Sequence, residues 1–391
     1  MRPMLSTCLL AAALACPISV SAQSLVPTSN PPTPVAVDEA RDAPRIQVAL
    51  LLDTSNSMDG LIHQAKAQLW GMVNELARHR RNGRDAVIEV ALYEYGNNDL
   101  SAQSGYIRRV VALTRDLDAV SEALFALDTH GGSEHCGEVI SRAVGELAWS
   151  NSGRDARFVF IAGNEAFTQG SLDYALACKA ATDKDITVNT IHCGSADEGR
   201  RGEWHLGAQL GNGEFLTIEQ DRAILDIRCP QDDHILELNR KLNSTYIPYG
   251  HEGSAMLRRQ EVQDGLAESV APTTAMARVA SKASSAYHND RWDLVDAVAA
   301  DRVEINEVER EQLPETLRSL DDDALLAEVE RRGTERAEVQ AEIKALQAER
   351  EVYLVAERKR LAGGDEGTLG DALVNVVRMR LDQVGFERVD P

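Results

Sequence analysis

One carboxylate and two hydroxyl groups stand at alternate positions just after an apolar run. The stretch Asp53-Thr-Ser55-Asn-Ser57 directly follows the apolar residues 46–52. Oxygen ligands of this kind suit a hard divalent cation, Mg²⁺ or Mn²⁺, with water or a partner in the remaining positions. Asp53 and Ser55 could also serve only to cap a following helix, but a cap has no need of Ser57. The spacing therefore predicts a cation site formed by Asp53, Ser55 and Ser57.

Apolar runs alternate with helical periodicities over residues 45–245, which predicts the elements that position these side chains. The predicted strands cover 46–52, 86–95, 106–113, 158–162, 186–192 and 215–218, and the predicted helices cover 61–76, 116–127, 139–149 and 171–182. Strands that alternate with helices form parallel βαβ units, so we expect a doubly wound, mostly parallel six-stranded α/β domain. Ligands of such sheets bind outside the carboxyl ends of the strands, where Asp53 lies.

The stretch Asp53-Thr-Ser55-Asn-Ser57 resembles the Asp-x-Ser-x-Ser signature of the von Willebrand factor type A (VWA) domain. In that family the signature belongs to a metal-ion-dependent adhesion site that binds Mg²⁺. The resemblance covers about residues 45–245 and implies a Rossmann-like sheet of strand order 3-2-1-4-5-6. The switch in strand order then falls between the strands that end at Asp53 and Ala162. The resemblance also implies a protein ligand, often one whose carboxylate completes the metal shell.

Two loops depart from the pattern of that family. The second loop of the family supplies a Thr ligand, and in segment 131–137 this position falls on Ser133 or on Glu134, depending on the direction of counting. We prefer Glu134, because a carboxylate is the stronger ligand and would lie beside a helix N-terminus. The third loop of the family supplies an Asp, which here falls on Gly163, so that Asn164 or Glu165 would have to substitute. The resemblance thus implies a non-standard site, with these candidate ligands: Asp53, Ser55, Ser57, Glu134, Ser133 and Asn164.

The N-terminus has the features of an export signal. Arg2 precedes the apolar run 9–15, and Val20-Ser21-Ala22 places small residues before Gln23. We therefore predict a signal peptide over 1–22 and a periplasmic or secreted protein, with lipoprotein anchoring at Cys16 as an alternative. Residues 23–44 are rich in proline and are predicted to form an extended linker.

Export changes the interpretation of the cysteines. Four remain after cleavage: Cys136, Cys178, Cys193 and Cys229. In an oxidising compartment they can form disulfides. We expect a Cys193–Cys229 pair, because both residues should follow neighbouring strands at one edge of the sheet. None of the four has the Cys-x-x-Cys spacing that is typical of zinc sites.

Composition and charge narrow the class of partner. The chain has 391 residues, of which 43% are hydrophobic, and its net charge is −21. A surface of this charge repels nucleic acids and anionic lipids, and the apolar run near the N-terminus is too short to span a membrane as a mature helix. Residues 246–279 are interpreted as a connecting segment, and 280–391 as a helical region with a partly coiled-coil-like register. This region would pack back on the α/β domain or allow self-association.

These observations favour an exported, non-enzymatic interaction or adhesion module that binds a protein through its cation site. One alternative is a metal-free scaffold with a degenerate site, because Gly163 removes a carboxylate of the family. A second alternative is a metal-dependent hydrolase that uses Asp53 and Glu134. Metal hydrolysis usually needs more carboxylates or histidines and a positioned base, so the enzyme is the weaker interpretation.

Overall fold

The structure, a computed structural model, describes residues 43–218, 227–361 and 369–389. The predicted signal peptide over 1–22, the alternative anchor Cys16 and nearly all of the predicted linker over 23–44 lie outside the described residues. The division of the chain at residues 245 and 280 stays a prediction.

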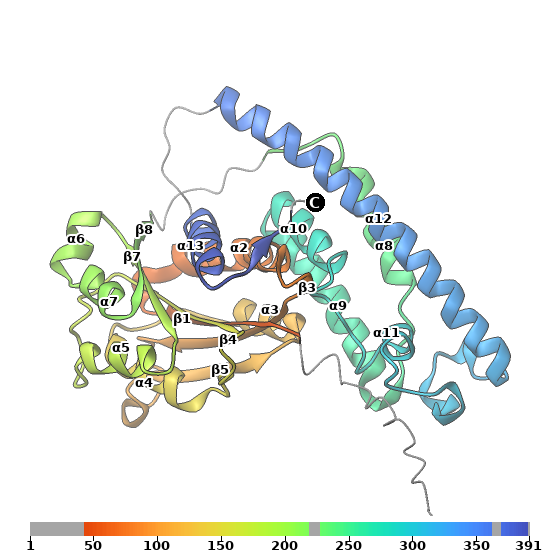
Figure 1. Ribbon diagram of the computed structural model, residues 1–391, viewed down its shortest axis with the longest axis horizontal. Helices are drawn as coiled ribbons and strands as arrows, with labels where there is room; N and C mark the ends of the chain where they lie inside the picture. The colour runs from red at the N-terminus through yellow and green to blue at the C-terminus, as the bar shows by residue number, and fades with distance from the viewer. Residues whose placement is uncertain (1–42, 219–226, 362–368, 390–391) are drawn as a thin grey trace, which may run out of the picture. The chain divides into compact units, whose positions relative to one another are not determined.

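A six-stranded sheet forms the centre of the α/β domain (Figure 1). Its strands, in chain order, are β1 (Arg45–Asp53), β4 (Val87–Tyr95), β5 (Ile107–Thr114), β6 (Ala156–Gly163), β7 (Thr187–Cys193) and β8 (Asn212–Ile218). In space they lie in the order β5-β4-β1-β6-β7-β8, and only the β4–β5 pair is antiparallel. With the strands of this sheet numbered along the chain, this is the order 3-2-1-4-5-6, so the predicted fold class is confirmed. The switch in strand order lies between β1 and β6, as expected.

Side chains alternate between the two faces of the sheet, and those of β1 are buried on both faces. Ile46, Val48 and Leu50 pack in one core, whereas Ala49 and Leu51 pack in the other. The first core includes side chains of α2 (Asp59–Ala77), α3 (Leu117–Phe125) and α13 (Leu369–Gln383). The second includes side chains of α4 (Cys136–Glu146), α5 (Tyr174–Thr182) and α7 (Trp204–Leu210), and the short α6 (Ala196–Arg201) precedes α7. The sheet is therefore enclosed by helices on both faces.

The segment interpreted as a connection, 246–279, is mostly helical. It contains α9 (Gly250–Val270) and most of α10 (Pro272–Lys282), which follow α8 (Asp232–Ser244). The inward side of α9 carries polar residues, including the buried Gln260, Gln263 and Asp264. A helix whose buried side is polar has no apolar stripe, and that stripe is the signal from which a helix is predicted.

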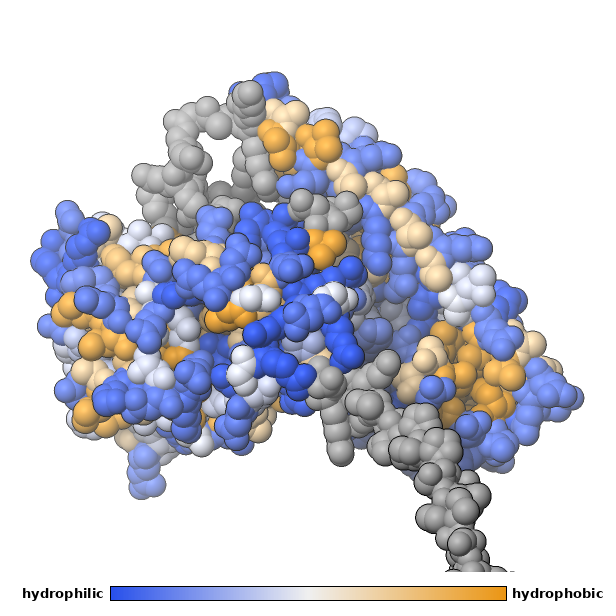
Figure 2. Space-filling view, viewed as in Figure 1, coloured by the Kyte–Doolittle hydropathy of each residue, from blue (hydrophilic) through white to orange (hydrophobic). Residues whose placement is uncertain are grey.

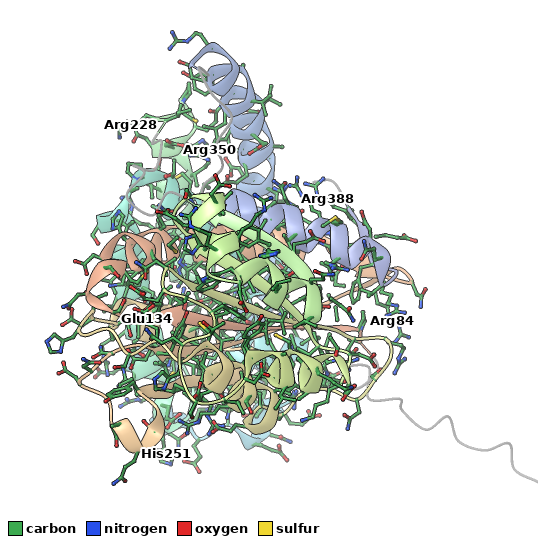
Figure 3. All side chains as sticks on the ribbon, turned by 90° about the vertical axis from the view of Figure 1, so that its left-hand side faces the viewer. Arg84, Glu134, Arg228, His251, Arg350 and Arg388 are labelled. Carbon is green, nitrogen blue, oxygen red and sulfur yellow. The ribbon has the colours of Figure 1, made fainter. Side chains whose placement is uncertain are left out.

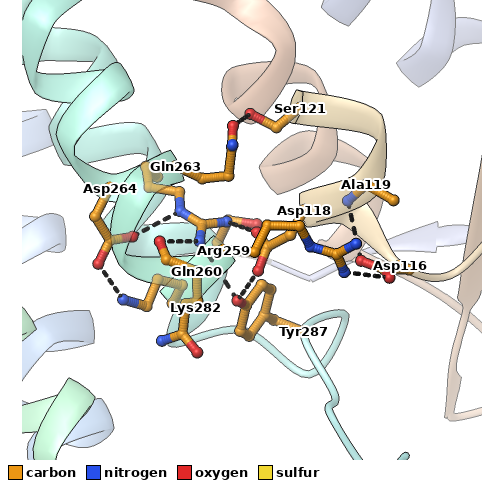
Figure 4. A network of polar contacts seen from close by, with 12 residues as sticks. Asp116, Asp118, Ala119, Ser121, Arg259, Gln260, Gln263, Asp264, Lys282 and Tyr287 are labelled. Carbon is orange, nitrogen blue, oxygen red and sulfur yellow. Dashed lines mark hydrogen bonds and ion pairs between the residues drawn. The ribbon is translucent and has the colours of Figure 1, made fainter. Parts of the chain in front are cut away.

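A buried polar network joins these helices to the α/β domain (Figure 4). Arg278 on α10 forms ion pairs with Asp118 on α3 and, at 2.9 Å, with Asp264 on α9. Lys282 Nζ lies 2.7 Å from the second oxygen of Asp264, and Tyr287 donates a hydrogen bond of 2.6 Å to Asp118. All five side chains are buried, so the junction is held by mutually neutralised charges as well as by apolar contacts.

The C-terminal part of the chain returns to the α/β domain. The 40-residue α12 (Asp322–Leu361) follows α11 (Leu294–Ala299) and three short 3₁₀ turns. Next in the described part comes α13, which packs on α2 and lies within the region predicted to be helical. The final strand β9 (Glu387–Arg388) pairs with β2 (His79–Arg81), which in turn pairs with β3 (Arg84–Asp85) in a small second sheet.

The face of the molecule shown in Figure 2 is largely hydrophilic, with apolar side chains showing along α12. On this helix the side chains of Val352 and Val355 are 73% and 57% exposed. Within the part of the chain that the structure describes, no helix combines the length and apolar character that a membrane span requires.

The expected Cys193–Cys229 disulfide is wrong. Cys136, Cys178, Cys193 and Cys229 are each recorded as a buried thiol outside any disulfide. Cys193 ends β7 inside the first core, whereas Cys229 packs with Ile227 and Leu354 of α12 in a separate cluster. The two residues follow neighbouring strands along the chain, but their side chains enter different cores.

Candidate metal centre

Asp53 is the last residue of β1, and its side chain is fully buried at the carboxyl edge of the sheet. The backbone N–H of Ser55 donates to Asp53 Oδ1 over 2.7 Å, so the turn after the strand fixes this carboxylate. Its other oxygen, Oδ2, is buried and has no hydrogen-bond partner among the described residues. A buried carboxylate oxygen without a donor is costly unless a cation or a proton compensates it.

The predicted serines lie together beside this carboxylate. Ser55 Oγ and Ser57 Oγ are 3.3 Å apart, and the amide nitrogen of Asn164 donates to Ser57 Oγ over 3.1 Å. Asn164 follows β6 across the switch in strand order, and its carbonyl oxygen Oδ1 is buried without a partner in the described structure. The hydroxyls of the first loop and the amide of the third loop therefore meet at one place.

Glu134, labelled in Figure 3, comes to the same place from the loop before α4. Its side chain is buried, and its backbone N–H donates to the side-chain oxygen of Gln169. Gly96, which follows β4 with φ +84°, shows how close the two acidic side chains lie. A Cβ atom on Gly96 would be 2.6 Å from Asp53 Oδ1 and 2.9 Å from Glu134 Cγ. Only glycine leaves room for both acids, and only glycine readily adopts this backbone conformation.

Both carboxyl groups have perturbed proton affinities. Burial raises the pKa of Asp53 well above its usual value, and the negative charge of Glu134 raises it further. Burial also raises the pKa of Glu134, although hydrogen bonds that involve Asp53, Ser55 and the backbone of Glu165 partly offset the effect. Without a cation, both buried carboxyl groups therefore favour the protonated form. A bound divalent cation would instead neutralise the two carboxylates.

Ser133, the other candidate of the second loop, has a backbone role in the described structure. It forms an antiparallel bridge with Gly96, in which the Ser133 N–H donates to the Gly96 carbonyl over 3.4 Å. The contacts recorded for the described residues include none between the Ser133 hydroxyl and Asp53. The choice between Ser133 and Glu134 as a ligand stays a prediction, and the geometry favours Glu134.

The structure explains why position 163 is glycine and not the aspartate of the family. A Cβ atom at this position would lie 2.6 Å from Tyr95 Oη and 3.1 Å from Asp53 Oδ2. Tyr95 is buried at the end of β4 and donates a hydrogen bond of 3.0 Å to the Ala162 carbonyl. The tyrosine hydroxyl thus occupies space that an aspartate at position 163 would need. Tyr95, Gly96 and Gln169 could not be predicted from the sequence, because none belongs to a recognisable motif and each reaches the site through long-range contacts.

The donor set fits a hard divalent cation. Asp53 and Glu134 would supply carboxylate oxygens, Ser55 and Ser57 hydroxyls, and Asn164 an amide oxygen, all of which are ligands that Mg²⁺ and Mn²⁺ accept. Among the residues that the structure describes, no group of three or more His, Cys, Asp or Glu side chains could hold a metal. The site has hard oxygen donors but lacks the carboxylate-rich or histidine-rich centre that metal-dependent hydrolases usually have.

A doubly wound sheet with an oxygen-donor site at its switch point defines a class of α/β domains that bind ligands above the sheet. The family model described as the von Willebrand factor type A domain matches residues 47–203. This part of the chain belongs to the VWA family, whose members are generally protein-interaction modules and often use a metal-ion-dependent adhesion site.

Solved structures similar to the chain include several VWA-type proteins. The conserved hypothetical protein BatB from Bacteroides thetaiotaomicron is 18% identical with a TM-score of 0.34, and the match covers 44% of this chain and 90% of that chain. An aerotolerance-related membrane protein from Bacteroides fragilis is 17% identical, with a TM-score of 0.31 and coverage of 45% and 93%. Proximal thread matrix protein 1 from the mussel byssus, whose adhesion site holds zinc, is 12% identical, with a TM-score of 0.35 and coverage of 46% and 43%. The search of curated proteins found no match.

Proposed function

We propose that this chain is an exported, non-enzymatic interaction module that binds a protein partner through one Mg²⁺ or Mn²⁺ ion. Asp53, Ser55, Ser57 and Glu134 would hold the ion, and Asn164 would supply a further oxygen. The observation that carries the proposal is the buried, unpartnered Oδ2 of Asp53 next to the carboxyl group of Glu134 and two serine hydroxyls. Export rests on the features of residues 1–22.

The cation would supply positive charge at the edge of the sheet and an open position for a partner oxygen. Two carboxylates balance the charge of one divalent ion, so the loaded site would be near neutral. In the family pattern a single carboxylate from the first loop is joined by one from the third. Here Glu134 from the second loop would replace the carboxylate that Gly163 removes, and a neutral or acidic partner oxygen could complete the shell.

Capture of the partner from the cell envelope tests this function. We expect the full chain to retain a partner in Mg²⁺ and to lose it in EDTA, and Asp53→Asn to lose it under both conditions. The exposed Asp197→Asn on α6 is the matched control, and it should retain the partner. Retention that is equal in Mg²⁺ and EDTA, and equal for Asp53→Asn, would contradict a cation-dependent interaction.

One observation favours the metal-free scaffold as the second candidate. The amide nitrogen of Asn164 donates to Ser57 Oγ, so a protein donor already occupies one of the proposed ligand oxygens without a cation. Thermal unfolding separates the two candidates. Mg²⁺ stabilises the folded chain if the folded state binds it, whereas the melting temperature of a scaffold with a degenerate site would not respond to Mg²⁺ or EDTA.

A further inference from the structure

A polar cavity lies at the opposite edge of the sheet from Asp53, where the α/β domain meets the helical region. Its volume is about 580 Å³, and its walls include Glu89 of β4, Leu113 of β5 and residues 288–292. Glu89 pairs in register with Gln47 near the start of β1, which places the cavity at the amino edge of the parallel strands. A ligand in this cavity would thus be separate from the candidate metal centre.

The acidic residues that line this cavity are already neutralised. Glu89 lies 3.6 Å from the guanidinium of Arg45, and Asp290 lies 3.1 Å from Arg302. Figure 4 shows the third acid, Asp116, paired with Arg259 and accepting the backbone N–H of Ala119. Each carboxylate of the lining is therefore paired with an arginine, although Arg259 also lies 3.9 Å from Glu122.

Two arginines of the lining have no acidic partner among the described residues. Arg115 lies in the turn between β5 and α3, and Arg291 lies in the segment between α10 and α11. No ion pair recorded within the described ranges engages either guanidinium, and both side chains are exposed. The chain as a whole has a net charge of −21, but these two arginines make this part of the cavity wall positively charged. The two arginines come from the two sides of the junction, so one anion could engage both.

The rest of the cavity wall offers apolar surface on a braced segment. Trp292 and Tyr249 line it together with Leu113. Tyr249 donates its backbone N–H to the Trp292 carbonyl over 2.9 Å and its hydroxyl to the Asp290 carbonyl over 2.8 Å. Aromatic walls with a few charged groups are typical of small-molecule sites, and the volume is within the usual range of such sites.

We propose that this cavity binds a small organic dicarboxylate, with one carboxylate on Arg115, the other on Arg291 and the carbon skeleton against Trp292 and Tyr249. Guanidinium groups bind carboxylates through two parallel hydrogen bonds, which favours carboxylates over other anions of equal charge. The apolar wall and the volume favour an organic anion over inorganic phosphate. Because the ligand would bridge the turn after β5 and the segment before α11, it would also stabilise the docking of the helical region.

Calorimetry of the full chain with defined probes tests the proposal. The probes are succinate, glutarate and phthalate, together with phosphate, the neutral diamide of succinate, and a short peptide of glutamates. We expect at least one dicarboxylate to bind below about 10 mM and to raise the melting temperature. The diamide, phosphate and the peptide should bind at least tenfold more weakly, on the order of 1.4 kcal/mol for each factor of ten.

Variants at the two arginines complete the test. Both side chains are exposed, so Arg115→Gln and Arg291→Gln should fold normally and should each weaken dicarboxylate binding by about tenfold. Arg200→Gln, on the exposed surface of α6, is the matched control and should bind as the unchanged chain does. Absence of dicarboxylate binding, equal binding of the diamide or phosphate, preferred binding of the peptide, or unchanged binding by both variants would each overturn the proposal.

Discussion

At the scale of residues, a close approach of side chains explains why the site departs from its family. Tyr95 Oη and the Asp53 carboxylate occupy the volume that a Cβ atom at position 163 would enter, so position 163 stays glycine. The carboxylate missing from the third loop has a counterpart in Glu134, which lies on the other side of Asp53 next to Gly96. The two departures are therefore linked through one buried aspartate.

This link predicts a compensating pair of substitutions. We expect Gly163→Asp alone to destabilise the protein by about 1–3 kcal/mol, because its Cβ would meet the Tyr95 hydroxyl at 2.6 Å. Adding Tyr95→Phe removes the hydroxyl and should recover part of that loss. Urea unfolding of the two variants and of Tyr95→Phe alone measures the effect. A double variant no more stable than Gly163→Asp would show that the hydroxyl is not the obstacle.

The choice of ligand in the second loop gives a second prediction. Glu134→Gln should weaken Mg²⁺ binding by at least tenfold, because it removes one of two buried carboxylates. Ser133→Ala should leave the Mg²⁺ affinity within about twofold. Ser133 pairs with Gly96 through its backbone, and this pairing does not depend on the hydroxyl group. Calorimetric titration with Mg²⁺ compares the two variants directly. Equal losses of Mg²⁺ affinity in the two variants would still support a cation site but would contradict the preference for Glu134 over Ser133.

The sequence predicted the part of the site that is local in the chain. Asp53, Ser55 and Ser57 share one turn, so their spacing alone brings them together, and the structure places them beside each other. Tyr95 and Gly96 reach the site only through the pairing of β4 with β1, and no short motif encodes that register. The ambiguity between Ser133 and Glu134 is of the same kind, because the backbone pairing of Gly96 with Ser133 orients the loop.

At the scale of elements, charged contacts attach the C-terminal elements to α2. Glu75 of α2 accepts hydrogen bonds from Arg378 of α13, at 2.6 Å, and from Arg388 of β9, at 2.9 Å. Burial alone would raise the pKa of Glu75, but the two arginines outweigh it and lower the pKa below the usual 4.5. Leu373, Val377 and the neighbouring apolar residues of α13 add the hydrophobic part of this contact.

Acidification should therefore weaken this attachment. A carboxylate whose pKa is lowered in the folded state stabilises the fold above its unfolded pKa, and this contribution is lost as the pH falls through the folded pKa. We expect Glu75→Gln to cost about 1–2 kcal/mol near neutral pH and progressively less as the pH falls below about 4.5. Unfolding free energies at several pH values test this, with the exposed Glu330→Gln on α12 as the control. A cost that does not change with pH would contradict the role assigned to the charge of Glu75.

Helices were predictable where an apolar stripe marks them, as in α2 and α13. The stripe is absent from α9, which buries Gln260, Gln263 and Asp264. Its partners, Ser121 and Arg278, lie far away in the chain, so only the folded structure shows why polar residues face inward. The expected disulfide was wrong for a related reason, because adjacency of strands does not determine which core a side chain enters.

At the scale of the whole molecule, the buried network joins the α/β domain to the helical region. The described residues from Ala43 onward belong to one compact unit. Arg278 lies between Asp118 of α3 and Asp264 of α9, and its guanidinium is 4.4 Å from the ring of Trp70 on α2. Burial alone would lower the pKa of Arg278. The attraction of Asp118 and Asp264 outweighs burial, so the pKa lies well above its usual value.

Breaking this network should destabilise the whole chain. Asp118→Asn leaves the buried guanidinium with one carboxylate in place of two, which should cost on the order of 3 kcal/mol. We expect a single unfolding transition in urea that shifts as a whole. Asp183→Asn removes an exposed ion pair with Lys179 and should cost less than about 1 kcal/mol. Two separate transitions in either variant would show that the two parts fold independently.

Direct titration of the EDTA-treated full chain with Mg²⁺ tests the central claim of a cation site most directly. We predict one Mg²⁺ or Mn²⁺ ion per chain at concentrations up to about 1 mM, and no binding to Asp53→Asn. Circular dichroism should show that the variant remains folded, because the asparagine oxygen can still accept the Ser55 N–H, and Asp53 Oδ2 has no hydrogen-bond partner among the described residues. The absence of binding by the unchanged chain up to about 10 mM, or equal binding by a folded Asp53→Asn variant, would contradict the account.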